Sequence, residues 1–332
     1  SIAMLRKSKG DLGSRLRRAA GAICTLAFAA ALASCAAPAP SDSQASDQPP
    51  VDLVVPPPPE TPRFFCERTI LGSADVSVED SESKWRRILT GEVDASTSFS
   101  KPFDVEACQG RIYVSDTVRR SVHILNVPTN EYREIGLDEP GALRKPLGMA
   151  VDSDCNLYVV DGTMKRVVVY DQDGDFLSAF GGSDKFERPT HVDVDADARY
   201  AYVVDTGGVS TQDHRIRVFD IASGDLAFDI GHRGDGPGEF NLPKDIAIGP
   251  DGLLYVVDSS NFRVQVLEAD GTYVHKFGSI GVQQGQFARQ KGVDTDPDGN
   301  GYVAVAAVGN GQLFNPAGQR LLLVGSGTSR PG

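Results

Sequence analysis

Apolar and polar residues alternate over short distances through most of the chain. In the segment from residue 147 to residue 180, the alternation falls into four short runs, residues 147–151, 157–161, 166–171 and 176–180. Asp- and Gly-containing segments separate these runs, including the sequence Asp-Gln-Asp-Gly at residues 171–174. A period of two bounded by such residues is typical of β-strands, and Asp-Gly is a common hairpin turn. The pattern therefore predicts four antiparallel strands in this segment.

The same unit occurs five times. Each copy begins at an anchor residue, continues to a second strand that resembles Tyr-Val-x-Asp, and ends at a Gly. The anchors are Pro102, Pro146, Pro189, Pro243 and Gln290, and the intervals between them are 44, 43, 54 and 47 residues. Repeats of this length with four strands each predict an all-β fold, a β-propeller of four-stranded blades. The expected blades cover residues 102–136, 146–181, 189–231, 243–278 and 290–325.

Two features recur at the same position of the copies and predict structural roles. A Tyr lies three residues before the end of each second strand, at Tyr113, Tyr158, Tyr202, Tyr255 and Tyr302. We expect these rings to pack between neighbouring blades. The Asp of the motif (Asp116, Asp161, Asp205, Asp258) and the Arg that follows it in the middle copies (Arg166, Arg215, Arg263) are expected to hold second and third strands together. Val305 replaces this Asp in the fifth copy.

The glycines that close the copies suggest a sixth blade. They lie at Gly91, Gly136, Gly181, Gly231, Gly278 and Gly325, and the first has no complete copy before it. We therefore expect a six-bladed ring with a composite last blade. Residues 63–91 contribute its outer strand, from residues 64–72 or 85–91, and its inner strands come from beyond Gly332. The alternative is a five-bladed ring with an N-terminal appendage.

The N-terminal region predicts export. Basic residues dominate residues 4–18, and the apolar residues 19–33 are too few to span a bilayer, so residues 1–34 are predicted to be a signal peptide. The sequence Leu-Ala-Ser-Cys that ends at Cys35 resembles the bacterial lipobox, which implies lipidation of Cys35. In the alternative, an ordinary signal is cleaved nearby and Cys35 is incidental. Residues 35–62 are rich in Pro, Ala and Ser and are expected to be a disordered tether. Residues 63–332 then form the propeller.

Charge and cysteine content limit the kinds of partner and of metal site that the chain can have. The net charge is −12, and removing residues 1–34 leaves −17, which argues against nucleic acid as a partner. Cys66, Cys108 and Cys155 remain after Cys35, and they show no zinc-ligand spacing. Cys108 and Cys155 fall near the first hairpins of adjacent blades, but the sequence does not assign a disulfide.

Residues 146–181 and 243–278 resemble NHL repeats, and residues 56–332 resemble bacterial six-bladed NHL-repeat propeller lipoproteins. The resemblance implies mainly a binding function. A lyase with an NHL-type propeller holds zinc through His residues directly after the anchors. Here those positions carry Phe103, Leu147, Thr190, Lys244 and Lys291, so the resemblance argues against that activity.

A binding face is expected where the inner strands begin. Two long loops, residues 205–214 and 231–242, lie on this face and offer the candidate residues Asp213, His214, His232, Arg233 and Asp235. The residues two positions after the anchors should surround the channel mouth, and they include Asp104, His191 and Asp245. These three side chains are suited to hold calcium or zinc or to polarise a ligand. In the alternative, they bond backbone groups at the strand entrances.

These observations predict a lipid-anchored propeller in the bacterial cell envelope that binds a protein, peptide or glycan and uses no resident cofactor. Some lipoproteins are retained in the inner membrane by an Asp directly after the lipidated Cys, and this chain has Ala36 at that position. We therefore expect the protein to be anchored in the outer membrane and to face the periplasm. The alternative function is a metal-dependent hydrolase or lyase with its centre in the channel. No catalytic residue is assigned.

Overall fold

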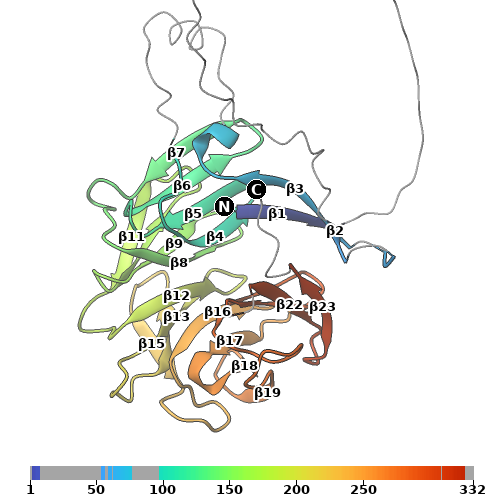
Figure 1. Ribbon diagram of the computed structural model, residues 1–332. Helices are drawn as coiled ribbons and strands as arrows, with labels where there is room; N and C mark the ends of the chain where they lie inside the picture. Colours follow the sequence, from blue (N-terminus) through green and yellow to red (C-terminus); the bar gives the residue numbers. More distant parts are fainter. Residues whose placement is uncertain are drawn as a thin grey trace, which may run out of the picture. The chain divides into compact units, whose positions relative to one another are not determined.

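The computed structural model describes residues 2–7, 54–56, 59–61, 63–76, 97–307 and 309–325. Within these residues, five four-stranded antiparallel sheets follow one another along the chain (Figure 1). The first two sheets consist of β4 (Pro102–Cys108), β5 (Arg111–Asp116), β6 (Ser121–Asn126), β7 (Glu131–Ile135), β8 (Pro146–Val151), β9 (Leu157–Asp161), β10 (Arg166–Tyr170) and β11 (Phe176–Gly181). The third consists of β12 (Pro189–Val194), β13 (Tyr200–Asp205), β14 (Arg215–Asp220) and β15 (Leu226–Ile230).

The fourth and fifth sheets continue the pattern. They consist of β16 (Pro243–Ile248), β17 (Leu254–Asp258), β18 (Arg263–Leu267), β19 (Tyr273–Phe277), β20 (Gln290–Thr295), β21 (Gly301–Val305), β22 (Asn310–Phe314) and β23 (Arg320–Val324). Each sheet begins at one of the anchor residues. The first strands contact one another in chain order, β4 with β8, β8 with β12, β12 with β16 and β16 with β20, so they are the inner strands around a channel. This is the arrangement of propeller blades.

The repeated Tyr residues join neighbouring blades, as predicted. Tyr158 lies in one apolar cluster with Val192 and Phe219 of the next sheet. Tyr113, Tyr202 and Tyr255 are likewise buried in clusters that contain residues of the sheet that follows. Burial of aromatic rings between sheets replaces hydrogen bonding at the sheet edges.

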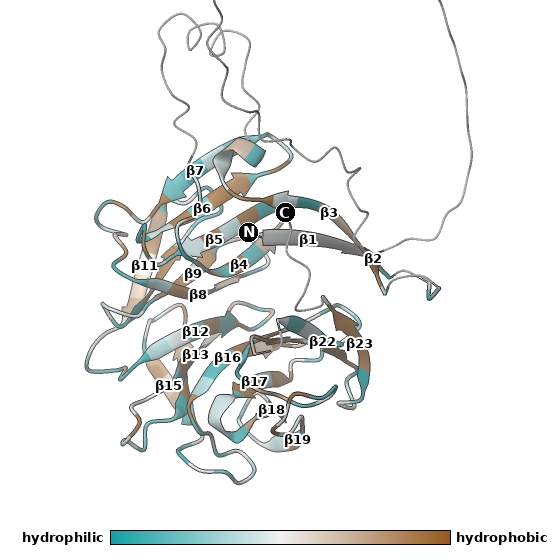
Figure 2. Cartoon of the chain, in the orientation of Figure 1, coloured by the Kyte–Doolittle hydropathy of each residue, from teal (hydrophilic) through white to brown (hydrophobic). Residues whose placement is uncertain are grey.

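The outer face of the fifth sheet is only partly covered. Tyr302 is half-buried, unlike its four equivalents, and Leu321 is 41% exposed. Figure 2 shows the hydrophobic colour over most of β23. On the other side, β4 exposes Phe103 and Val105. Among the described residues, β20 and β4 do not contact each other as the other inner strands do.

The N-terminal part of the chain differs from the prediction where it is described. β3 (Phe64–Ile70), expected as a strand of the closing blade, pairs instead with β1 (Ile2–Lys7) and β2 (Val54–Val55) in a three-stranded sheet. β2 lies within the range expected to be a tether. The chain divides into two compact units, residues 4–67 and residues 1–3 with 68–332.

Cys35, the signal peptide from residue 8 onward, most of the tether and the alternative closing strand at residues 85–91 lie outside the described residues. In the part of the chain that is described, no helix is long and apolar enough to cross a membrane.

A disulfide joins the first two blades. Cys108 at the end of β4 is bonded to Cys155 in the β8–β9 turn, 47 residues later in the chain. The sequence placed both residues on adjacent first hairpins but did not pair them. Cys66 is a free thiol. The cross-link closes a long loop and so restricts the unfolded chain.

The Asp that ends each second strand is a buried hydrogen-bond centre. Asp161 is fully buried and accepts the backbone N–H groups of Arg144 and Lys145, at 2.7 and 3.1 Å, from the connector before its blade. It also accepts those of Thr163 and Met164, at 2.9 and 3.1 Å, from the turn after it. Asp116, Asp205 and Asp258 bond the corresponding connectors in the same way. The carboxylate therefore fixes the entrance of each inner strand.

The predicted Asp–Arg pairs form in two of three blades. Asp258 lies opposite Arg263 in the β17–β18 register and binds it at 2.7 Å, and Asp205 lies 4.0 Å from Arg215. Arg166 donates instead to the carbonyl of Ala142.

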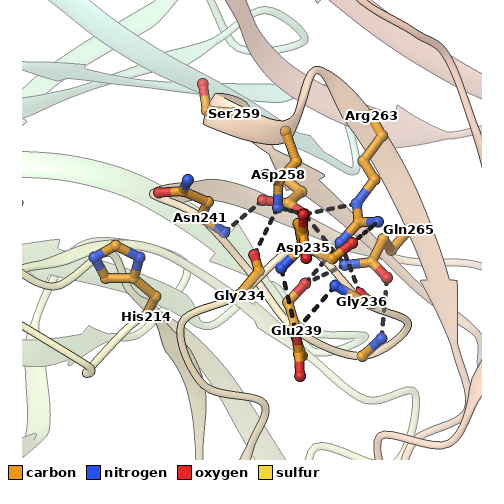
Figure 3. A network of polar contacts seen from close by, with 12 residues as sticks. His214, Gly234, Asp235, Gly236, Glu239, Asn241, Asp258, Ser259, Arg263 and Gln265 are labelled. Carbon is orange, nitrogen blue, oxygen red and sulfur yellow. Dashed lines mark hydrogen bonds and ion pairs between the residues drawn. The ribbon is translucent and has the colours of Figure 1, made fainter.

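Figure 3 shows the fullest version of this network, around Asp258 and Arg263. Arg263 donates to the carbonyls of Asp235, Gly236 and Glu239, at 2.7 to 2.9 Å. The pair therefore holds the long connector at residues 231–242 as well as the two strands.

Replacing Asp161 with Ala should lower the free energy of unfolding by about 2–4 kcal/mol, because four backbone N–H groups lose their acceptor. Chemical denaturation measures the change. Asp197→Ala is the matched control, since Asp197 is exposed in a turn. Equal stability of the two variants would contradict the proposed role of Asp161.

Candidate ligand-binding channel

Three titratable side chains meet where the inner strands begin. Nδ1 of His191 on β12 lies 2.9 Å from Oδ1 of Asp245 on β16 and 3.6 Å from Oδ2 of Asp104 on β4. The structure thus brings together the three residues that the sequence placed around the channel. We call Asp104, His191 and Asp245 the channel triad.

Glycines at the equivalent positions of the other two blades make room for the triad. A Cβ on Gly148 would lie 2.0 Å from Nδ1 of His191, and one on Gly292 would lie 2.9 Å from Oδ2 of Asp245. Any larger residue would displace these side chains. Gly148 and Gly292 therefore leave the space that the triad side chains occupy.

The carboxylates of the triad also bind backbone. Oδ2 of Asp104 accepts the N–H of Met149, and Oδ2 of Asp245 accepts the N–H of Val293, both at 2.7 Å. Each bond joins one inner strand to the next. One oxygen of each carboxylate therefore bonds a backbone group, as the alternative interpretation of these residues predicted. The second oxygen of Asp245 faces His191.

The triad favours a charged imidazole. Burial opposes charge on His191, but the carboxylates of Asp245 and Asp104 outweigh burial and raise its pKa to about 10. Burial raises the pKa of Asp104 to about 6, with His191 acting in the opposite direction and Asp245 adding to the rise. At neutral pH the triad is thus an imidazolium between two carboxylates.

The triad offers few free donor atoms to a metal ion. Oδ2 of Asp104 and Oδ2 of Asp245 each accept a backbone N–H, and Nδ1 of His191 faces Oδ1 of Asp245. Within the described ranges, no group of three or more His, Cys, Asp or Glu side chains is placed to hold a metal ion. The calcium or zinc that the sequence allowed has no suitable ligand set in these residues.

A second acidic layer lies two residues further along the inner strands. Glu106, Asp193 and Asp294 line a cavity of about 370 Å³ together with the triad. Burial is the main cause that raises the pKa of each, to about 7 for Asp193, whose hydrogen bond from the N–H of Ile248 (2.6 Å) opposes the rise. This layer was not predicted from the sequence. The period of two along each strand could have identified it, because these residues share a face with the triad positions.

A larger cavity of about 740 Å³ opens at the start of the inner strands, and we call it the mouth. The triad lies at its floor. Its lining also includes Phe103, which is 54% exposed, and four basic residues, Lys145, Arg188, Lys244 and Lys291. From the sequence, Lys244 and Lys291 were noted only as positions that lack His, and the basic group was not predicted.

The two long loops contribute less than the sequence suggested. His214 is fully buried, its Nε2 lies 2.8 Å from the carbonyl of Gly208, and its Nδ1 accepts the N–H of Leu242. Its assignment to a binding surface was wrong, because both ring nitrogens bond backbone that holds the loop.

The other four loop residues retain some exposure. Asp213 pairs with Arg215 at 3.2 Å, and Arg233 donates to the carbonyl of Thr211. His232 is exposed and lies 3.4 Å from Glu239, and Asp235 is exposed.

Comparison with known proteins identifies the repeat. The NHL repeat family matches residues 240–267, which contain β16, β17 and the buried Asp258–Arg263 pair. The chain is a β-propeller that contains an NHL repeat. A segment of 64 residues is 39% identical to the RING finger protein nhl-1 of Caenorhabditis elegans, which is 19% of this chain and 7% of that protein.

Solved structures share the propeller fold. A streptogramin B lyase is 15% identical with a TM-score of 0.51, and the match covers 67% of this chain and 68% of that one. The virginiamycin B lyase of Staphylococcus aureus is 13% identical with the same TM-score, over 67% of this chain and 69% of that one. At this identity the likeness shows the fold alone.

The ionised triad makes the stability of the NHL-repeat propeller depend on pH. Because the pKa of His191 is raised in the folded state, its contribution is complete below about pH 6.5 and is lost as the pH rises towards 10. One extra bound proton gives a slope of about 1.4 kcal/mol per pH unit. The free energy of unfolding should fall over this range, and His191→Gln should flatten the slope.

Denaturation curves at several pH values measure this slope. His232→Gln is the control, because the side chain of His232 is 66% exposed and its loss leaves the channel intact. If His191→Gln keeps the full wild-type slope, the imidazolium does not exist.

Proposed function

We propose that this protein is an extracytoplasmic propeller, anchored to the cell envelope through a lipid on Cys35, that binds a protein, peptide or glycan at its mouth. One observation carries the proposal. The mouth is the largest cavity described above, about 740 Å³, and its charged side chains converge from several blades. A concave site with convergent polar groups is suited to binding.

The disulfide supports a location outside the cytosol. Cys108 and Cys155 are bonded, and disulfides persist in the bacterial periplasm and outside cells but are rare in the cytosol. This agrees with the expected export signal and the lipobox-like sequence before Cys35. The location in the outer membrane, facing the periplasm, remains part of the proposal.

Photo-cross-linking in cells followed by membrane fractionation tests both the lipid anchor and the binding site. With p-benzoyl-phenylalanine in place of Phe103, irradiation should give a discrete cross-linked adduct in the membrane fraction, because this exposed ring lines the mouth. The same change at Leu177 is the matched control, since Leu177 is 51% exposed on the outermost strand β11. Replacing Cys35 with Ser should move the protein into the soluble fraction.

Two results would reject the proposal. Adducts of the same mass and yield from both positions would show that the mouth is not a preferred site. Unchanged membrane association of Cys35→Ser would exclude the lipid anchor at this residue.

We also propose that the ring has a sixth position, between the fifth sheet and the first. The partial exposure of Tyr302, Leu321 and Val105 supports this proposal, because a blade between the two sheets would cover them. With β3 paired elsewhere, residues 85–91 are the remaining candidate for the outer strand.

The only Trp of the chain, Trp85, reports on this position. We expect blue-shifted Trp emission and weak quenching by acrylamide, because a blade strand would bury the indole ring. Emission typical of an exposed indole, unchanged on unfolding, would contradict a blade at residues 85–91.

A further inference from the structure

The mouth concentrates positive charge in an acidic protein. Its lining contains Lys145, Arg188, Lys244 and Lys291, whereas the chain as a whole carries a net charge of −12. These residues come from the second to the fifth blade and immediately precede or follow the anchors. A cluster drawn from four repeats, against the overall charge, produces a local positive field at the channel entrance.

The four basic side chains lack acidic partners. Other cations of the propeller are paired, such as Arg119 with Glu134 at 2.8 Å and Arg217 with Asp229 at 2.9 Å. None of the four mouth cations forms an ion pair with a carboxylate in the part of the chain that the structure describes. Their charge is therefore available to a ligand.

The lowered pKa of Lys244 reflects its burial and the repulsion among these basic residues. Burial lowers its pKa, and the nearby charges of Lys291, Arg188 and Arg289 lower it further. Like charges held together without counter-charges destabilise the free protein. A ligand that brings negative charge removes this repulsion, and so gains binding energy from it.

The rim around the mouth is aliphatic. The turns between second and third strands lie beside the mouth, because Thr117 and Gly162 donate their N–H groups to the carbonyls of Lys101 and Lys145. These turns and the third one expose large apolar side chains, Val118 at 62%, Met164 at 46% and Val209 at 75%. Phe103 is the only Phe, Tyr or Trp in the described lining.

This composition distinguishes between anionic ligands. Single-stranded nucleic acids bind on surfaces where several aromatic rings stack with bases. An aliphatic rim beside basic residues instead suits a peptide whose acidic residues alternate with apolar ones. Carboxylates would contact the lysines, and apolar side chains would cover Val118 and Met164.

We infer that the mouth is a binding site for an acidic peptide segment with interspersed apolar residues, recognised by Lys145, Arg188, Lys244 and Lys291. This inference rests on the proposed binding function and specifies the chemistry of its ligand. The channel triad lies at the floor, where His191 balances part of the charge of Asp104 and Asp245.

Fluorescence anisotropy with defined peptides tests the inference on the full-length protein. The probe is a fluorescein-labelled peptide of three Glu-Leu repeats. Lys244→Glu with Lys291→Glu should weaken its binding about tenfold to a hundredfold, because two attractive charges become repulsive. Raising the salt concentration should weaken wild-type binding as well.

The matched control is Lys276→Glu with Arg320→Glu. These exposed residues lie on the outermost strands of the same two blades, β19 and β23, and the change in net charge is identical. The control should bind within about twofold of wild type. Thermal melting of each variant verifies folding, and Lys244→Gln with Lys291→Gln replaces the charge reversal if that variant does not fold.

The outcomes separate the inference from the proposed function. Equal losses in both double variants would overturn the inference, because they would reflect net charge alone. Tighter binding of an oligo-uridylate or of dextran sulfate than of the peptide would overturn the peptide class. Absence of peptide binding, together with a specific adduct from position 103, would reject the acidic ligand while the binding function stands. A peptide of three Lys-Leu repeats should not bind.

Discussion

The buried carboxylate at the end of each second strand is the interaction on which the propeller depends. Asp161 accepts the backbone N–H of Lys145, and Asp205 accepts that of Arg188. Lys145 and Arg188 directly precede the anchors Pro146 and Pro189. The same atoms that close the blade therefore fix the backbone that carries two of the mouth cations. Stability and the geometry of the candidate site thus arise from one constraint, a buried charge that must be fully hydrogen-bonded.

The fifth blade shows how the constraint is met without this Asp. Val305 occupies the position, and Gln290 replaces the anchor Pro. The Gln290 side chain is buried and donates to the carbonyls of Asp258 and Ser259, so an amide from the inner strand links this blade to the fourth. The blade keeps its regular register although the motif is lost. Packing and backbone pairing therefore override the local motif.

Local periodicity made the blades predictable, whereas side-chain partners across blades were not. The second strand of blade two was predicted at residues 157–161 and is observed as Leu157–Asp161, because alternation and turn residues are properties of the local sequence. The convergence of Asp104, His191 and Asp245 followed from equal positions in equivalent strands. The ion pair within the triad, the Cys108–Cys155 bond and the burial of His214 depend on distances between blades, which a single sequence does not contain.

Charge is layered along the channel, and this layering constrains what can enter. Four cations without an ion-pair partner among the described residues line the mouth, His191 between two carboxylates forms its floor, and Glu106, Asp193 and Asp294 follow beyond it. A negatively charged group is attracted to the mouth, whereas the cavity behind the triad is lined by carboxyl groups and, among the described residues, by no Lys or Arg. A ligand with carboxylates therefore has its energy minimum at the mouth, close to the apolar rim. This favours a surface-bound peptide over a small anion that passes into the channel.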